Sequence, residues 1–157
     1  MAPARAGGKR RLDDDTKQAA IRLQILATRL LRIARSMHGK QGVGSAQYSA
    51  MAVLYERGAL PLGELARAER VAHPTMSRVV AGLAKLGAIA READPDDGRS
   101  RRVALTDEGR ALYEKISENR VAMTAAILDQ LSKASRDELI EVVGRIAGPL
   151  EEKMRPD

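Results

Sequence analysis

Apolar residues recur every three or four positions near the start of the chain, which is the spacing of one face of a helix. Between residues 16 and 38 this stripe consists of Leu23, Leu26, Leu30, Ile33 and Met37. It predicts an amphipathic helix that ends before Gly39. Three further apolar residues, Ile21, Ile25 and Leu31, lie off the stripe. Because one small domain cannot cover a helix that is apolar on several sides, we expect a partner subunit.

The middle of the chain predicts a second helix and then a helix-turn-helix. Ser45 is expected to cap a helix that stops at Gly58. After a short extended stretch at 60–62, a brief helix over 63–70 and a turn at 71–73 lead to a helix over 74–86, with Pro74 in its first position. The inward face of this last helix is expected to carry Met76, Val79, Val80 and Leu83. Thr75, Ser77, Arg78 and Lys85 are expected nearer its other face.

A hairpin and two long helices follow. Residues 88–93 predict a strand, the Asp- and Gly-rich segment 94–98 predicts a turn, and 102–105 predicts an antiparallel strand that buries Val103 and Leu105. Thr106 is expected to cap the next helix. The sequence Ser135-Arg136-Asp137-Glu138 fits a capping box that opens a last helix, in which Pro149 is expected to cause a kink or a break.

Composition narrows the class of protein. The chain has 157 residues, which is enough for one domain with a real core, but it contains no Phe, no Trp and no Cys. The lack of cysteine excludes disulfides, thiolate zinc sites and thiol-based redox sensing. The two histidines, His38 and His73, lie on different predicted elements, and no catalytic motif or phosphate-binding glycine loop is present. We therefore expect no enzymatic activity, no cofactor and no metal.

Charge is distributed unevenly along the chain. The net charge is +6 at pH 7, and residues 16–40 contain six Lys or Arg and no acid, whereas acids outnumber bases from residue 107 onward. A basic N-terminal half suits a polyanionic partner, although simple solvation also accounts for it. No run approaches the roughly 20 apolar residues of a membrane span. We expect a soluble, cytoplasmic, nucleoid-associated protein without membrane contact.

The segment 62–109 contains Asp97-Gly98-Arg99 followed by Val103-Ala104-Leu105-Thr106-Asp107-Glu108-Gly109, which is its most specific motif. With this motif, residues 62–109 resemble the multiple-antibiotic-resistance-regulator (MarR) family of bacterial transcription factors. The resemblance implies a mainly α (α+β) winged helix-turn-helix fold with long N- and C-terminal dimerisation helices. It also implies a homodimeric regulator of transcription that binds a pseudo-palindromic operator in double-stranded DNA, more often as a repressor than as an activator.

By this resemblance the helix over 74–86 enters the major groove, where small polar side chains and Arg read base edges. Thr75, Ser77 and Arg78 are the candidate contacts to bases or phosphates, and His73 is expected near a phosphate at the start of the helix. Two structural alternatives stay open. Thr75 and Ser77 also fit as solvated or back-bonded residues, and Arg78 also fits a surface ion pair with Glu69.

The wing carries the remaining candidates. By the same resemblance Arg99 enters the minor groove, whose narrow shape attracts guanidinium groups. An ion pair of Arg99 with Asp97 or Asp94 is the alternative. Arg101 and Arg102 point in opposite directions if the strand is regular, so only one of them faces DNA, and we expect Arg101.

These expectations define a domain plan. Residues 1–15 form a disordered arm, and 16–157 form one domain, with dimerisation helices at 16–44 and 110–157 and the DNA-binding region at 45–109. Family members commonly bind a small aromatic or phenolic effector between these regions, so an effector is a candidate partner. His38, Tyr48, Met51 and Tyr55 lie on that side but are interpreted as core residues. A sequence-independent, architectural DNA-binding protein is the alternative function.

Overall fold

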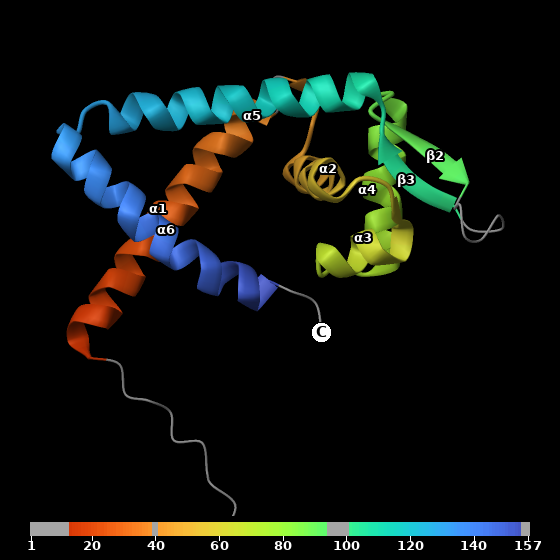
Figure 1. Ribbon diagram of the computed structural model, residues 1–157. Coiled ribbons are helices and arrows are strands. Elements are labelled where there is room, and N and C mark those ends of the chain that lie inside the picture. Colours follow the sequence, from red (N-terminus) through yellow and green to blue (C-terminus); the bar gives the residue numbers. More distant parts are fainter. Residues whose placement is uncertain (1–12, 39–40, 94–100, 155–157) are drawn as a thin grey trace, which may run out of the picture. The chain divides into compact units, whose positions relative to one another are not determined.

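The computed structural model describes residues 13–38, 41–93 and 101–154, which contain six helices and three short strands. In chain order these are α1 (Asp14–His38), α2 (Ser45–Arg57), β1 (Leu60–Pro61), α3 (Leu62–Ala68), α4 (His73–Lys85), β2 (Ile89–Ala93), β3 (Arg101–Leu105), α5 (Asp107–Leu128) and α6 (Lys133–Met154). Figure 1 labels the helices and the two strands of the wing, β2 and β3. The expected mainly helical fold with a small wing is confirmed. Of the expected arm, residues 1–12 lie outside the described part of the chain.

Helix α1 begins two residues before the predicted start at Thr16. Asp13 precedes the helix, and its carboxylate accepts hydrogen bonds from the backbone N–H of Thr16 at 2.8 Å and from the Thr16 hydroxyl at 2.8 Å. These bonds lower the pKa of Asp13. An aspartate in this position satisfies N–H groups that the first helical turn leaves free. The helix therefore begins close to Thr16, as predicted, but two residues earlier, because the capping residue is Asp13.

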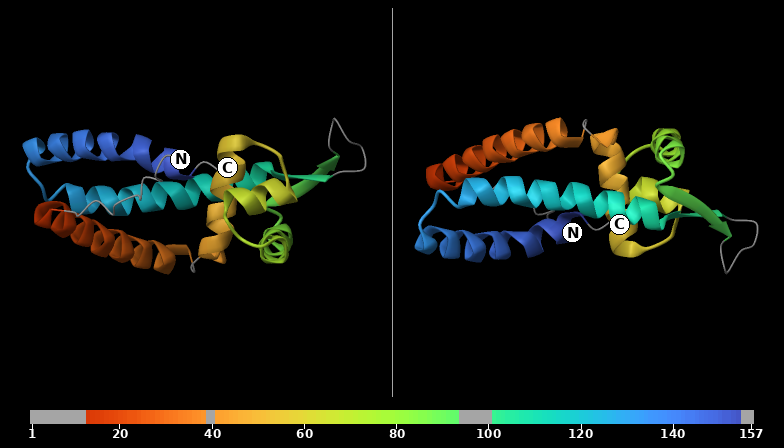
Figure 2. Two further views of the ribbon diagram at one scale, coloured as in Figure 1. Left: turned by 90° about the horizontal axis from the view of Figure 1, so that it is seen from below. Right: turned by 90° about the horizontal axis from the view of Figure 1, so that it is seen from above.

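The three strands form one antiparallel sheet in the order β1-β3-β2. The β2–β3 register runs from Ile89 opposite Leu105 to Ala93 opposite Arg101, so the two strands form the expected hairpin. Two short pairings, Leu60 with Val103 and Pro61 with Arg102, join β1 to the central strand β3. Figure 2 shows the hairpin projecting beyond α3 and α4 at the end of α5 where that helix begins.

The buried core lies between α2, α3, α4, the sheet and the first half of α5. Its largest fully buried side chains are those of Met51, Leu54, Leu65, Met76, Leu83, Ile116, Val43 and Val80. All of these are aliphatic or Met, as the absence of Phe and Trp requires. The predicted inward face of the fourth helix is confirmed, since Met76, Val80 and Leu83 are buried and Val79 packs against the core.

Both helices of the helix-turn-helix end in the same backbone motif. After α3, Val71 N–H donates to Ala66 O and Arg70 N–H to Arg67 O; after α4, Ala88 N–H donates to Leu83 O and Gly87 N–H to Ala84 O. These paired bonds define Schellman ends, which need a left-handed residue. That residue is Gly87 (φ 68°) after α4 but Arg70 (φ 53°) after α3. The predicted ends, Arg70 and residue 86, were one or two residues too late for this reason.

The start of α5 is fixed against the start of the wing. Thr106 caps the helix as predicted, because its hydroxyl oxygen accepts from Gly109 N–H at 2.9 Å. The same hydroxyl donates to Gly87 O at 2.7 Å, and Thr106 N–H donates to Ala88 O at 3.1 Å. A Cβ on Gly109 would overlap the Ala88 carbonyl oxygen. The Thr-x-x-Gly sequence therefore joins the end of α4, the base of the wing and the first turn of α5.

Two other predicted helix starts were wrong. Helix α2 is preceded by Gly44, whose backbone N–H donates to the Gln47 side chain at 2.7 Å, so Ser45 is the first helical residue and not the cap. Helix α6 starts at Lys133 after Ser132, whose hydroxyl oxygen accepts from Ser135 N–H at 3.2 Å. Pro149 lies inside α6 without dividing it.

Replacing Gly109 by Ala tests this junction. We expect Gly109→Ala to lower the free energy of unfolding by about 2–4 kcal/mol, because the added methyl group must displace backbone atoms. Gly63→Ala is the control, since a Cβ at Gly63 meets no atom within 4 Å. Urea unfolding at one protein concentration measures both. Equal stabilities of Gly109→Ala and wild type would contradict the close approach.

Candidate nucleic-acid interface

Helix α4 presents one face to the core and the opposite face outward. Thr75 and Arg78 are exposed, and Ala81 and Lys85 continue the same outward stripe along the helix. Ser77 is half-buried at the edge of this stripe. The structure therefore brings Thr75 and Arg78 together as predicted, while Ser77 is less accessible than the sequence suggested. An exposed helical face of small polar and cationic residues has the dimensions and chemistry to enter a major groove.

The outward polar side chains of α4 are available for contacts outside the chain. Within the part of the chain that the structure describes, neither the Thr75 nor the Ser77 hydroxyl forms a hydrogen bond, and Arg78 forms no ion pair. The alternative pairing of Arg78 with Glu69 is not formed. A long cation that is extended into solvent without an internal partner keeps its full charge for an external anion.

The N-terminus of α4 adds a positive end to this surface. The helix begins at His73, with Pro74 in the following position rather than in the first one as expected. The preceding residue, Ala72, provides no side-chain cap, and His73 is exposed. Free N–H groups and the helix dipole make such an end favourable for an anion. This is consistent with the expectation that His73 lies near a phosphate of DNA.

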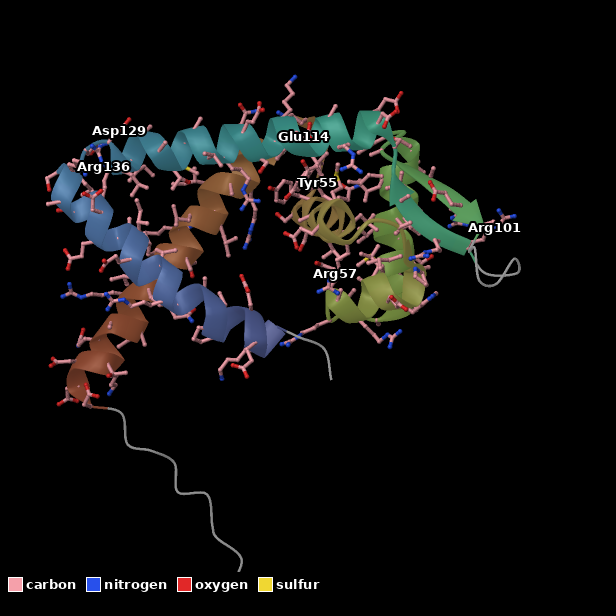
Figure 3. The ribbon with its side chains drawn as sticks, viewed as in Figure 1. Tyr55, Arg57, Arg101, Glu114, Asp129 and Arg136 are labelled. Atoms are coloured by element: carbon pink, nitrogen blue, oxygen red, sulfur yellow. The ribbon has the colours of Figure 1, made fainter. Side chains whose placement is uncertain are left out.

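The hairpin places Arg101 and Arg102, of which the sequence expected only one to face DNA, in different environments. Arg101 is exposed at the first position of β3, whereas Arg102 is half-buried and donates to the carbonyl oxygen of Ala59 from Nε at 3.1 Å and from Nη2 at 2.6 Å. Figure 3 shows Arg101 at the outer end of β3. The expected alternation is confirmed, and Arg101 is the arginine that faces outward. Arg99 lies outside the described residues, as do its candidate ion-pair partners at 94 and 97.

A tyrosine cluster lies behind this surface, between α2 and α5. The Tyr113 ring is stacked on Tyr48 with a centroid distance of 5.2 Å and lies 4.7 Å from Tyr55. The guanidinium of Arg120 lies 4.4 Å from the Tyr48 ring centroid, and that of Arg110 lies 5.2 Å from the Tyr55 centroid. These distances are typical of aromatic pairs and cation–π contacts. The structure thus brings together all three tyrosines of the chain.

This cluster corrects part of the sequence interpretation. Met51 is buried and Tyr48 packs against the core as expected, but the Tyr55 side chain is exposed and donates to Glu114 Oε1 at 2.9 Å (Figure 3). The bond to Glu114 raises the pKa of Tyr55, and burial raises the pKa of Tyr113 to about 12. The spacing of Tyr48 and Tyr55 was the missed signal, since seven residues are two helical turns and place both rings on one face. The side chain of His38 lies outside the described part.

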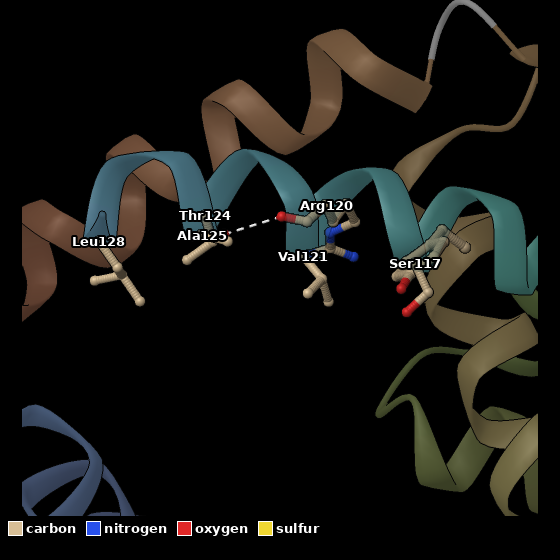
Figure 4. A pocket seen from close by; sticks show the side chains of 7 residues that line it. Ser117, Arg120, Val121, Thr124, Ala125 and Leu128 are labelled. Carbon is tan, nitrogen blue, oxygen red and sulfur yellow. Dashed lines mark hydrogen bonds between the residues drawn. The ribbon is translucent and has the colours of Figure 1, made fainter. Parts of the chain in front are cut away.

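Two open hollows lie beside the tyrosine cluster along α5. The first has a volume of about 470 Å³ and is shown in Figure 4; it is lined by Tyr48, Ser117, Arg120, Val121, Thr124, Ala125 and Leu128. The second, of about 480 Å³, is lined by Tyr55, Tyr113, Glu114, Ser117, Glu118, Val121 and Ala122. Both have the size of small-molecule sites and carry tyrosine at their walls. Tyrosine therefore supplies the aromatic part of both linings in a chain that has neither Phe nor Trp.

The described residues contain no group of three or more side chains suited to hold a metal ion. None of the helices in the described part of the chain is long and apolar enough to cross a membrane.

Comparison with known proteins identifies the class to which this protein belongs. Residues 44–100 match the MarR family. A helix-turn-helix-type transcriptional regulator of Mycobacterium tuberculosis is 35% identical over 126 residues, which span 80% of this chain and 87% of the relative. The transcriptional repressor MdtR of Bacillus subtilis is 29% identical over 108 residues, 69% of this chain and 70% of MdtR. A MarR family protein of Bacillus stearothermophilus superposes with a TM-score of 0.77 at 25% identity, covering 92% of this chain and 99% of that structure.

A helix-turn-helix followed by a β-hairpin wing defines a winged helix-turn-helix DNA-binding protein. The chain belongs to the MarR family. The protein is therefore a DNA-binding regulator of transcription and not an enzyme, and sequence-specific regulation is favoured over the architectural alternative.

Proposed function

We propose that the outward face of α4 reads the operator in the major groove and that the wing holds the adjacent backbone and minor groove. The observation that carries this proposal is the exposed, unpaired Arg78 beside Thr75 on a helix whose opposite face is locked into the core. Ser77 contributes from the edge of the face and His73 from the helix start. Arg101 contacts the backbone and Arg99 enters the minor groove.

Substitution of Arg78 tests base readout. We expect Arg78→Ala to weaken binding to the operator by about 1–3 kcal/mol while changing binding to random duplex much less, because a bidentate contact to a base is lost. Fluorescence anisotropy with both duplexes measures the difference. Lys115→Ala removes the same charge from an exposed position on α5 and serves as the control. Equal losses on operator and random DNA would reduce Arg78 to a phosphate contact.

We also propose that the protein is a homodimer. Helix α1 exposes apolar side chains, among them Leu23, Leu26 and Leu31, each about half exposed. Helix α6 exposes Ile140 (71%), Val143 (55%) and Leu150 (55%) on one stripe. Such apolar surface on long helices is typical of an interface. A two-fold dimer would present two α4 helices to half-sites about one turn of DNA apart and would block promoter access as a repressor.

The mass in solution tests the dimer. Sedimentation equilibrium at micromolar concentration is expected to give the mass of two chains. We expect Ile140→Glu combined with Val143→Glu to give monomers, because a charge cannot be buried unpaired in an apolar contact. Glu141→Gln is the control on the same helix, since Glu141 pairs with Arg145 on the helix surface. A wild-type mass of one chain would refute the proposal.

An effector is the last part of the proposal. The tyrosine-walled hollows suit a small aromatic or phenolic molecule, with Arg120 available to an acidic group. The chain has no Trp, so its intrinsic fluorescence comes only from Tyr48, Tyr55 and Tyr113. We expect members of a panel of benzoates and phenols to quench this emission saturably and to weaken DNA binding, and Arg120→Met to reduce affinity for the benzoates. Linear quenching by every compound would contradict an effector site here.

A further inference from the structure

The β2–β3 hairpin of the wing is joined to β1, and through it to α2, by very few backbone pairings. Strand β1 has two residues, and one of them, Pro61, pairs with Arg102 of β3. Proline has no backbone N–H and cannot donate to the ladder, which confines it to edges of sheets. The β2–β3 hairpin has five paired positions, whereas β1 and β3 have two. Backbone pairing therefore connects β3 to β2 more extensively than it connects β3 to β1.

The side chain of Arg102 strengthens this weak connection. Its Nε and Nη2 both donate to the Ala59 carbonyl oxygen, at 3.1 Å and 2.6 Å, one residue before β1 begins. Hydrogen bonds from a charged donor are stronger than neutral ones, and these are partly buried. The guanidinium thus extends the attachment of β3 beyond the short β1 ladder.

The carbonyl that Arg102 holds belongs to the turn that ends α2. Helix α2 stops at Gly58, whose N–H donates to Leu54 O at 3.0 Å and whose φ of 76° is a conformation favoured by glycine. Ala59 follows directly and leads into β1. Arg102 therefore connects the central strand of the wing to the C-terminal end of α2, where no other charged side chain in the described part donates to this carbonyl.

We propose that Arg102 is a positioning residue for DNA binding: it fixes the angle of the β2–β3 hairpin against α2 and so places Arg101 on the DNA backbone. This inference rests on the proposed function, in which the wing contacts DNA. Arg101 and Arg102 are adjacent on β3 and point to opposite sides. Arg102 binds the Ala59 carbonyl and Arg101 is exposed, so loss of the Arg102 side chain would displace Arg101.

A direct phosphate contact by Arg102 is the competing explanation, and a double-mutant cycle separates the two. We expect Arg102→Met to weaken operator binding about tenfold in the wild-type background but less than about threefold in an Arg101→Ala background, because coupled residues are not additive. Arg102→Lys is expected to recover most of the loss, since one ammonium donor still reaches a single carbonyl oxygen. The same fold-loss in both backgrounds would overturn the proposal.

Arg91→Met provides the matched control. Arg91 is exposed on β2, and its replacement removes the same charge from the neighbouring strand without touching Ala59. Its effect on affinity is expected to add to that of Arg101→Ala. Coupling of Arg91 with Arg101 as strong as that of Arg102 would show that lost charge, and not lost positioning, causes the effect, and would overturn the proposal.

Hydrogen exchange on the free protein tests, without DNA, whether the bonds from Arg102 to Ala59 hold β3 in place. Arg102→Met is expected to accelerate amide exchange about tenfold or more in residues 58–60 and along β3, while exchange in the α4 core stays unchanged. Unchanged exchange in 58–60 would overturn the proposal even if the variant bound DNA poorly. Conversely, faster exchange in Arg102→Met would show that Arg102 attaches β3 to Ala59. If Arg101→Ala nevertheless bound DNA with full affinity, the wing contact and hence the positioning role would be refuted.

Discussion

The winged helix-turn-helix depends on the contact between the Ala88 carbonyl and the first turn of α5. Gly109 lacks the Cβ that this carbonyl excludes, and Thr106 binds Gly109, Gly87 and Ala88 through one hydroxyl and one backbone N–H. Three elements meet there: the end of α4, the start of β2 and the start of α5. Because interiors are close-packed, a displacement of one of these elements is transmitted to the other two.

This junction explains how a small aliphatic core presents a precise polar surface. Helix α4 is buried through Met76, Val80 and Leu83 and fixed at its end by Gly87, which leaves Thr75 and Arg78 outward in a set orientation. The hairpin starts from the same junction and is tied on its other side by Arg102. Helix α5 continues from it to the tyrosine cluster, so one helix contributes both to the base of the proposed DNA-binding surface and to the hollows beside Tyr113.

The sequence predicts the helices, the hairpin and the faces of α4 because each of these depends on local periodicity and turn chemistry. Thr106 as a cap and the opposite directions of Arg101 and Arg102 follow from the same local rules. The ends of helices were harder to predict. Arg70 takes a left-handed conformation that glycine usually supplies, and the caps at Asp13 and Ser132 lie outside the segments that the apolar pattern marks.

Contacts between distant elements were beyond the sequence. The pairing of Tyr55 with Glu114 joins residues 59 positions apart, and the bond from Arg102 to Ala59 joins residues 43 positions apart. No local pattern encodes such distances, since they depend on how α5 and β3 pack on α2. The seven-residue spacing of Tyr48 and Tyr55 indicated a shared face, but the third ring, Tyr113, is placed there only by the fold.

We propose that the outward face of α4 and the wing recognise a particular DNA sequence and not merely the charge of DNA. The most direct test is to locate the bound sites by genome-wide footprinting and then to measure affinity for the best site and for unrelated duplex over a series of salt concentrations. We expect a two-fold symmetric site that keeps a preference on the order of 10³ or more over unrelated duplex at every salt concentration. Affinities for the two duplexes that are equal and fall together as salt rises would contradict it.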